Sequence, residues 1–350
     1  MKKVHVSAST KEYDVTVGRE IDYGKTLLEI HPACKLMVVS DDTVWSLYGE
    51  KTIRSFEDAG FETVSFVFPH GEKSKNLSVA QELMVKMIDE GITKSDLLIA
   101  LGGGVVGDLT GMVAGVFLRG MDFVQLPTTL LAAIDSSVGG KTAVDLPNGK
   151  NMAGTFHQPI GVFCDIDSFR TLPKETYAEG MAEAIKYGMI YDADLFGQIE
   201  NRTISDEDLV LRCVEIKAEV VAMDEFDKGP RHILNFGHTL GHAVETLSEY
   251  TIGHGQGVAM GMACVSGATL NDLELQRVLN VLKDYNLPTR SDFDPDALSV
   301  QAKADKKRHG DHIRVVLPVE IGKVEIKDIT FDEWNNIVKN GTKRVIEAGC

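Results

Sequence analysis

The chain lacks several features that would restrict its class. Its five cysteines in 350 residues include no Cys-x-x-Cys pair and are odd in number, so a disulfide-stabilised secreted scaffold is not indicated. The first residues, MKKVHVSAST, have no apolar core behind the lysines, which argues against a signal peptide. The most apolar long stretch, 257–270, is too short and too rich in glycine for a transmembrane helix. We therefore expect a cytoplasmic protein.

Positive charge is also scarce. The chain has 36 Lys and Arg against 52 Asp and Glu, a formal net charge of −16. Such a chain repels nucleic acid and anionic membranes, so neither is an expected partner. An anionic ligand would need a local gathering of basic side chains. Apolar content of 43% and charged content of 25% are typical of a globular enzyme, and the length suggests two domains.

Residues 1–170 alternate between two kinds of pattern. Apolar strand-like runs at 35–40, 61–68, 95–104 and 123–127 are separated by helical patterns such as 44–60 and 76–91. This alternation predicts βαβ units and a Rossmann-like parallel sheet. Residues 171–350 are instead mainly helical in period, at 174–200, 206–225, 233–250 and 257–285, before a short strand pair at 312–326. The expected fold is an α/β domain over 1–170 followed by a mainly α-helical domain over 171–350.

A glycine loop, ALGGGVVGDLTG, follows one of the predicted strands. Gly102, Gly104 and Gly107 have the spacing GxGxxG and open a helical pattern. Glycines there let the backbone approach a pyrophosphate, and the N-terminus of the helix favours its negative charge. The alternative is a tight strand-to-helix turn without a ligand, and the loop lies on a late strand rather than the first.

Several basic residues gather in segments already suspected of ligand contact. Gly139 and Gly140 precede Lys141, and Gly149 precedes Lys150. Glycine beside lysine in a loop suits phosphate or carboxylate binding. The alternative for each lysine is a solvated surface side chain. Further candidates lie in the helical half: Lys186, Lys217, Arg231, Lys306 and Lys307.

Histidine spacing raises the possibility of a metal site. His238 and His242 are four residues apart in RHILNFGHTLGHAVE, so they share a helix face, and His254 follows in a glycine-rich turn. Glu183 could complete a mixed nitrogen and oxygen site suited to zinc. The alternatives are hydrogen-bonded core or surface histidines, and a surface ion pair between Glu183 and Lys186.

Six segments together resemble one known family. They are LGGGVVGD, LPTTLLAAIDSSVGGKTAVD, NGKN, AEAIKYG, RHILNFGHTLGHAVE and DKK, in this order over nearly the whole chain. The chain is similar to the 3-dehydroquinate synthases. The resemblance implies a homodimeric, cytoplasmic enzyme of the shikimate route with NAD and one divalent metal, zinc or cobalt. It implies conversion of 3-deoxy-D-arabino-heptulosonate 7-phosphate to 3-dehydroquinate and phosphate, by transient oxidation by NAD, phosphate elimination, re-reduction and intramolecular aldol closure.

The same resemblance implies roles for individual residues. The metal ligands would be Glu183, His238 and His254, whereas His242 would assist proton movement near the substrate phosphate. Arg119 would reach the phosphate bound by a neighbouring subunit. The other substrate-binding residues would be Asp135, Lys141, Asn151, Lys186, Lys217, Arg231, Asn235 and Lys306, the lysine we favour over Lys307. NAD contacts would come from Asp41, Glu72, Lys75, Gly103, Gly104, Gly107, Asp108, Thr128, Thr129, Lys141, Lys150 and Thr171.

Some positions depart from the family pattern, which puts local geometry in doubt but not the assignment. Gln256 and Gly257 stand where an acidic residue and alanine are common, and Pro230 stands where an aliphatic residue is common.

One rival function is that of another sugar-phosphate cyclase, which would differ at substrate positions. A second is a metal-dependent polyol dehydrogenase of related fold, which would consume NAD. A third is a catalytically inactive NAD-binding protein.

Overall fold

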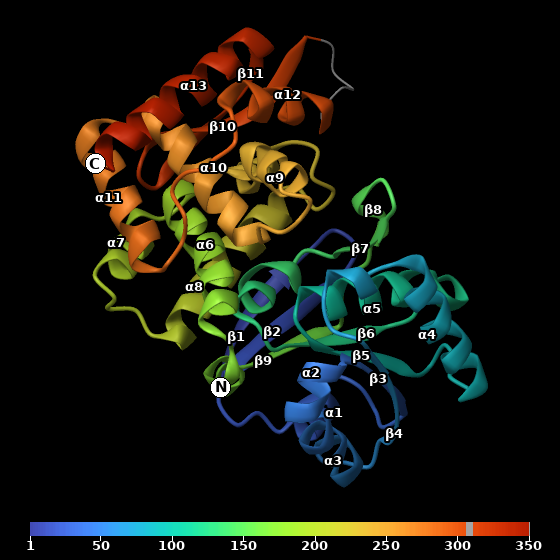
Figure 1. Ribbon diagram of the computed structural model, residues 1–350. Helices are drawn as coiled ribbons and strands as arrows, with labels where there is room; N and C mark the ends of the chain where they lie inside the picture. Colours follow the sequence, from blue (N-terminus) through green and yellow to red (C-terminus); the bar gives the residue numbers. More distant parts are fainter. Residues whose placement is uncertain (306–310, 350) are drawn as a thin grey trace. The chain divides into compact units, whose positions relative to one another are not determined.

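The computed structural model describes residues 1–305 and 311–349 and divides into two compact units (Figure 1). Unit 1 comprises Met1–Leu172 and Asp206–Phe226, and unit 2 comprises Pro173–Ser205 and Asp227–Cys350. The sequence pattern assigned all of 171–350 to a second domain, and Asp206–Phe226 differs from that expectation. Its helix α8 (Asp206–Met223) packs against strand β1 and the short helix η4 (Ala132–Ser136) of unit 1, because its apolar face finds its partner there.

A carboxylate ties the end of α8 to unit 1. Glu225 is 5% exposed and accepts hydrogen bonds from the hydroxyls of Ser9 and Thr10. It also accepts from the Thr10 N–H at 3.0 Å and from Gln158 Nε2 at 2.9 Å. Burial alone would raise the pKa of Glu225, but these hydrogen bonds hold it below its usual value.

A seven-stranded sheet forms the centre of unit 1. Its strand order is β1-β2-β9-β6-β5-β3-β4, and every neighbouring pair is parallel except β1 with β2. The strands are β1 (Lys2–Ser7), β2 (Glu12–Gly18), β3 (Lys35–Asp41), β4 (Glu62–Phe68), β5 (Leu97–Gly102), β6 (Phe123–Pro127) and β9 (Gly161–Asp165). The predicted fold class, a parallel-sheet α/β domain before a helical part, is confirmed.

Helices cover both faces of this sheet, as its strand sequences require. In β3, Met37 and Val39 join the cluster under α4 (Leu77–Asp89) and α5 (Gly104–Val116), whereas Leu36 and Val38 join the opposite cluster. Successive side chains of a strand point to opposite faces, so a continuous apolar run indicates burial on both. The opposite cluster includes side chains of α1 (Tyr23–Leu28), α3 (Glu50–Asp58) and the π-helical turn η1 (Trp45–Gly49), which follows α2 (Asp42–Val44).

The hairpin of β7 (Lys141–Leu146) and β8 (Gly149–Phe156) is separate from the large sheet and carries the glycine and lysine segment. In β7 buried Thr142 and Val144 alternate with more exposed neighbours, whereas every residue of β8 is partly or fully exposed. Short helical turns complete unit 1: η2 (Glu72–Ser74), η3 (Phe117–Arg119) and η5 (Ile166–Thr171).

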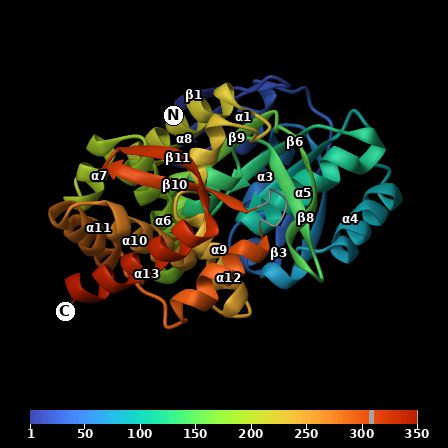
Figure 2. The same cartoon turned by 90° about the horizontal axis from the view of Figure 1, so that it is seen from above.

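Unit 2 is built around helix α10 (His254–Thr269), which is buried along most of its length. It packs against α6 (Lys174–Ile190), α9 (His238–Leu247), α11 (Asp272–Asp284) and α13 (Phe331–Ala348), and Figure 2 shows the same helices from above. The predicted strand pair is present as β10 (His312–Glu320) and β11 (Lys323–Thr330). The remaining elements are α7 (Ala193–Glu200), α12 (Pro295–Asp305) and the 3-10 helix η6 (Pro230–Asn235). Over residues 1–305 and 311–349, no helix is both long and apolar enough to cross a membrane.

Candidate functional site

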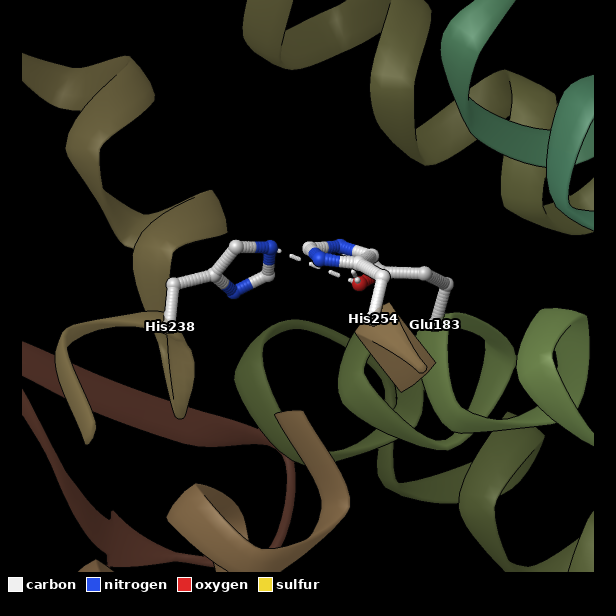
Figure 3. A group of neighbouring side chains, drawn as sticks. All are labelled: Glu183, His238 and His254. Atoms are coloured by element: carbon white, nitrogen blue, oxygen red, sulfur yellow. Dashed lines mark ion pairs between the residues drawn. The ribbon is translucent and has the colours of Figure 1, made fainter. Parts of the chain in front are cut away.

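Three helices of unit 2 bring Glu183, His238 and His254 together. Glu183 lies on α6 and is fully buried, while His238 and His254 are the first residues of α9 and α10. Oε1 of Glu183 lies 3.4 Å from Nε2 of His238 and 3.5 Å from Nε2 of His254 (Figure 3). The sequence placed His254 in a turn before a helix that begins at 257, whereas in the structure the helix begins at His254 itself. Residues distant in the chain thus present three donor atoms to one point.

A backbone crossing of α9 and α10 sets the separation of the two histidines. A Cβ on Gly261 would lie 1.9 Å from the carbonyl oxygen of Gly237, and a Cβ on Gly257 would lie 2.9 Å from that of Gly241. Only glycine permits such an approach, and Gly237 also adopts a left-handed φ of 78°. The departure Gly257 therefore has a structural reason in this chain.

The first turn of α10 is held by groups from two directions. The N–H of Gly253 donates to Oε1 of Gln256 at 3.3 Å, and the N–H of Gly255 donates to Glu179 on α6. Burial raises the pKa of Glu179. Glu179 has no role in the sequence-based prediction, although it lies four residues before Glu183 on the same helix face. Its contact helps to hold His254 in place.

The second ring nitrogens of both histidines are also engaged. Nδ1 of His238 lies 3.1 Å from the carbonyl oxygen of Phe236, and Nδ1 of His254 lies 3.0 Å from Oε1 of Glu245. A carbonyl or carboxylate oxygen only accepts, so each Nδ1 carries the proton and each Nε2 is turned toward Glu183. Metal-binding histidines in proteins show this pattern.

The spacing of the donor atoms suits a small divalent cation. A tetrahedral ion with bonds of about 2.0–2.1 Å separates its ligand atoms by about 3.3 Å. The two nitrogen–oxygen distances of 3.4 and 3.5 Å are close to this value. Two imidazoles and a carboxylate are also a donor set that zinc accepts in proteins, so the residues present fit such an ion.

A buried cation already lies next to the cluster. Lys186 pairs with Oε2 of Glu183, and the two side chains are 1% and 0% exposed. The alternative of a surface ion pair is therefore wrong, because the pair lies in the interior. An unpaired carboxylate is costly there, so Lys186 stabilises Glu183 in its charged form.

The two histidines differ in their protonation. Burial lowers the pKa of His238 to about 3, although Glu183 opposes this effect. Burial also disfavours charge on His254, but its contacts with Glu183 and Glu245 raise the pKa of His254 to about 10. A proton on His254 thus balances the carboxylates, and a divalent cation would replace it.

His242 lies beside this cluster rather than within it. Its side chain is exposed, and its ring centre is 5.5 Å from that of His238 and 6.1 Å from that of His254. It forms a second group of possible donors with Glu245 and His254. The i, i+4 spacing alone could not choose between His242 and His254 as the partner of His238.

The other expected residues of unit 2 are placed as follows. Arg231 and Asn235 lie on η6, directly before His238, and Arg231 is 2% exposed. Lys306 and Lys307 lie outside the described residues. The chain segment that carries Arg231 is thus followed closely by His238 of the candidate metal site.

The expected NAD contacts of unit 1 gather at one edge of the sheet. Asp41 ends β3, Gly103 and Gly104 follow β5, and Thr128 and Thr129 follow β6. These strands are parallel, so their carboxyl ends share an edge. The chain leaves β3 for β4 on one side and returns to β5 on the other, and ligands bind at such a switch point in open α/β sheets. Gly107 lies in α5, Glu72 in η2, Lys150 in β8 and Thr171 in η5.

A buried lysine connects this edge with the β7–β8 hairpin. Lys75 is 4% exposed and lies 2.5 Å from Oδ2 of Asp108 and 2.6 Å from Oδ1 of Asn151. Burial disfavours its charge, but Asp108 and Glu72 hold the pKa of Lys75 above its usual value. The Asn151 N–H donates to Asp145 at 2.7 Å, which fixes a left-handed φ of 56° at Asn151.

Two further expected residues form a second contact in unit 1. Lys217 on α8 is 5% exposed, and its Nζ lies 2.5 Å from Oδ1 of Asp135 on η4. This pair explains how α8 contributes to unit 1. Lys141 begins β7 and is exposed, and Arg119 is exposed at the end of η3 with φ of 65°.

Comparison with known proteins shows the relationship of the chain. Residues 65–179 match the family model of the 3-dehydroquinate synthase N-terminal region, and residues 180–308 match that of the C-terminal region. The chain belongs to the 3-dehydroquinate synthase family. The resemblance drawn from the sequence motifs is thus confirmed.

Individual members and a solved structure agree with this assignment. A 3-dehydroquinate synthase of Caldanaerobacter subterraneus is 42% identical, over 97% of this chain and 100% of the relative. One of Thermodesulfovibrio yellowstonii is 40% identical, over 93% of this chain and 96% of the relative. The solved structure of ValA, a 2-epi-5-epi-valiolone synthase from Streptomyces hygroscopicus with NAD+ and Zn2+ bound, has a TM-score of 0.88 at 26% identity, covering 98% of this chain and 99% of ValA.

Glu245 is the functional candidate that the sequence reasoning missed. It is 3% exposed and lies three residues after His242 on α9, within a motif that was quoted for its histidines alone. A carboxylate on the same helix face as two histidines was the available signal.

Proposed function

We propose that the protein catalyses the 3-dehydroquinate synthase reaction, converting 3-deoxy-D-arabino-heptulosonate 7-phosphate to 3-dehydroquinate and phosphate. The observation that carries the proposal is that Glu183, His238 and His254 come together in a chain that matches this family over almost its full length. The enzyme class is therefore a phosphate-eliminating lyase that uses NAD and a divalent metal.

The cofactors are NAD and one divalent cation, zinc or cobalt. ValA, which has the same fold, binds NAD+ and Zn2+. When bound, NAD+ would supply reversible hydride transfer with the substrate, and the cation would polarise a substrate oxygen. Glu183, His238 and His254 would hold the cation. Unit 1 would hold NAD through Asp41, Glu72, Lys75, Gly103, Gly104, Gly107, Asp108, Thr128, Thr129, Lys141, Lys150 and Thr171.

Basic side chains would bind the phosphate and carboxylate of the substrate. Lys186 and Arg231 are buried in unit 2, where burial strengthens their attraction for an anion. They supply the local positive charge that the acidic chain as a whole lacks. Substrate contacts are proposed for Lys141, Asn151, Lys217, Asn235, Lys306 and Asp135 as well.

Proton movement is assigned to His242. It is exposed and lies beside the histidines of the metal candidate, so it can exchange protons with a ligand and with water. Its position outside the Glu183 group supports this role over a ligand role.

We propose that the active form is a cytoplasmic homodimer to which Arg119 contributes in trans. Leu118 and Arg119 both have left-handed backbone, with φ of 49° and 65°, and Leu118 is 45% exposed. A strained turn that presents an apolar and a basic side chain suits a contact with a second copy. Four cysteines, Cys34, Cys164, Cys213 and Cys264, are free thiols, in keeping with a reducing compartment.

Phosphate release tests the proposed reaction. The purified protein should release phosphate from the heptulosonate phosphate without net NADH formation, and a chelator should abolish release until zinc is restored. His254→Ala should be inactive, whereas His312→Ala, at an exposed strand position, should match the wild type.

The same assay separates the rival functions. Net NADH formation would indicate a polyol dehydrogenase. Turnover of another sugar phosphate in preference to the heptulosonate phosphate would indicate a different cyclase, and phosphate release that survives His254→Ala would contradict the site.

A further inference from the structure

Glu245 is a buried carboxylate that the proposed reaction does not use directly. It lies on α9, seven residues after His238, and is 3% exposed. Its Oε1 is 3.0 Å from Nδ1 of His254, on the side of the ring opposite to the nitrogen that faces Glu183. One imidazole therefore lies between two carboxylates.

The orientation of the His254 ring depends on its contact with Glu245 more than the orientation of the His238 ring depends on the Phe236 carbonyl. The His254 side chain is 31% exposed, against 12% for His238. Packing alone does not restrict a ring exposed to this extent. The hydrogen bond to Glu245 fixes the rotation of the ring and places the proton on Nδ1, which leaves Nε2 directed at Glu183.

The Glu245 side chain lies beside the crossing of α9 and α10. A Cβ on Gly257 would lie 3.4 Å from Cγ of Glu245, in addition to its close approach to Gly241. A Cβ at position 257 would be in ordinary contact with Glu245, so the Gly241 carbonyl sets the close approach there and Glu245 lies alongside α10.

We propose that Glu245 is a positioning residue for the metal site, which holds His254 in the orientation and protonation needed to bind a divalent cation. The inference rests on the proposed use of a metal by Glu183, His238 and His254. The carboxylate also increases the donor strength of the imidazole, because it stabilises the positive charge that the ring gains on coordination.

A different role for Glu245 is that of a direct ligand. The donor atoms of His242, Glu245 and His254 lie within 4.8 Å of one another. Glu245 meets His254 at Nδ1, so an ion that both residues bound through this contact would displace the proton that Nδ1 donates. His254 would then have to bridge two ions as an imidazolate and lose its last proton, which is unfavourable near neutral pH. The geometry thus favours positioning over coordination.

Metal affinity is the measurement that tests the inference. The full chain is freed of metal by a chelator, and Zn2+ is titrated in competition with a chromophoric chelator. Glu245→Gln keeps an acceptor oxygen but removes the charge, and we expect zinc to bind about tenfold more weakly; Glu245→Ala should lose up to about 100-fold. The matched control is Glu175→Gln, at an exposed carboxylate in the first turn of α6, and it should bind zinc as the wild type does.

Two further readouts separate positioning from a general structural role. Nitrogen NMR of the zinc-loaded protein should show the proton of His254 on Nδ1 in the wild type and a mixture of ring states in Glu245→Ala. The denaturation midpoint of the metal-free protein should change less in Glu245→Gln than the zinc affinity does. Wild type and Glu245→Gln should each bind one ion.

Clear results would overturn the inference. Unchanged zinc affinity in both Glu245 variants, or equal losses of metal-free stability and zinc affinity, would show that Glu245 does not act on the metal site. Two ions in the wild type and one in Glu245→Ala would make it a ligand. Phosphate release is measured separately. If zinc affinity falls from wild type to Glu245→Gln to Glu245→Ala as expected, but the wild type releases no phosphate, the proposed function is contradicted and the inference is left intact.

Discussion

Because α9 and α10 cross so closely, a single methyl group added at the crossing should destabilise the protein. In Gly261→Ala the new Cβ would lie 1.9 Å from the carbonyl oxygen of Gly237. A normal carbon–oxygen contact is about 3.3 Å, so the helices must separate locally by more than about 1 Å. Overpacking of this kind costs about 1–3 kcal/mol, against which the better helix propensity of alanine contributes about 1 kcal/mol. We expect a net loss of up to about 2 kcal/mol in the free energy of unfolding.

The same separation of the helices should also displace the histidines of the candidate metal site. His238 is adjacent to Gly237, and His254 is on the helix that Gly261 pushes away. Metal–ligand distances tolerate only about 0.2 Å of change, so zinc affinity should fall at least about tenfold. The assays are chemical denaturation of the metal-free protein and a zinc competition titration of the folded protein.

Gly197→Ala is the matched control for this prediction. Gly197 lies within helix α7, and a Cβ there would meet nothing within 4 Å. It should stabilise the protein by about 0.5–1 kcal/mol with no effect on zinc affinity. The reasoning is refuted if Gly261→Ala is as stable as Gly197→Ala, or if it binds zinc as tightly as the wild type.

Three other substitutions test separate contacts. Glu225→Gln should lower the free energy of unfolding by about 2 kcal/mol at neutral pH. Because the pKa of Glu225 is lowered in the folded protein, the difference from the wild type should shrink as pH falls below the usual carboxyl pKa. A difference that stays constant with pH in denaturation experiments would contradict this. Lys186→Met should destabilise the metal-free protein by about 3–5 kcal/mol because it leaves Glu183 buried without its cation, and zinc should raise the melting temperature of this variant more than that of the wild type. Lys217→Met should raise the KM for the heptulosonate phosphate without weakening zinc binding, and an unchanged KM would remove Lys217 from the substrate site.

The contacts of Lys75 bear on how NAD and substrate binding are related. Lys75 and Asp108 are both proposed NAD contacts, Asn151 is a proposed substrate contact, and all three meet in unit 1. The β7–β8 hairpin is therefore held in place by the same side chains that are proposed to bind the cofactor. Loss of Lys75 would disturb both proposed functions through one contact.

Much of the fold followed from local patterns in the chain. Continuous apolar runs such as 35–40 and 97–101 required strands buried on both faces, and the intervening helical periods required crossovers, so a parallel α/β sheet was predictable. The GxGxxG loop was correctly placed between a strand and a helix. The motifs in their order were sufficient for the family, because six collinear segments are far more specific than any one.

Other features depended on which surfaces meet in three dimensions. Helix α8 has a period like that of its neighbours in the sequence, and only its packing against β1 and η4 assigns it to unit 1. The spacing of His238 and His242 is ideal for one helix face, yet His254 from another helix shares Glu183 with His238. Helical periodicity is a property of one segment. Which ring, His242 or His254, lies with His238 at Glu183 depends instead on how α9 and α10 cross, including the close approach of Gly237 to Gly261.

Sequence by itself determined the element types, the family and the residues with suitable chemistry, because these depend on side-chain identity and short-range spacing. Tertiary structure alone decided the burial of the pair Glu183 and Lys186 and the contact of Glu245 with His254. Burial and long-range hydrogen bonds arise only when separate helices pack, and they control protonation through the removal of water. Glu183 and Lys186, whose spacing in the sequence also allowed a surface ion pair, are buried in the folded chain.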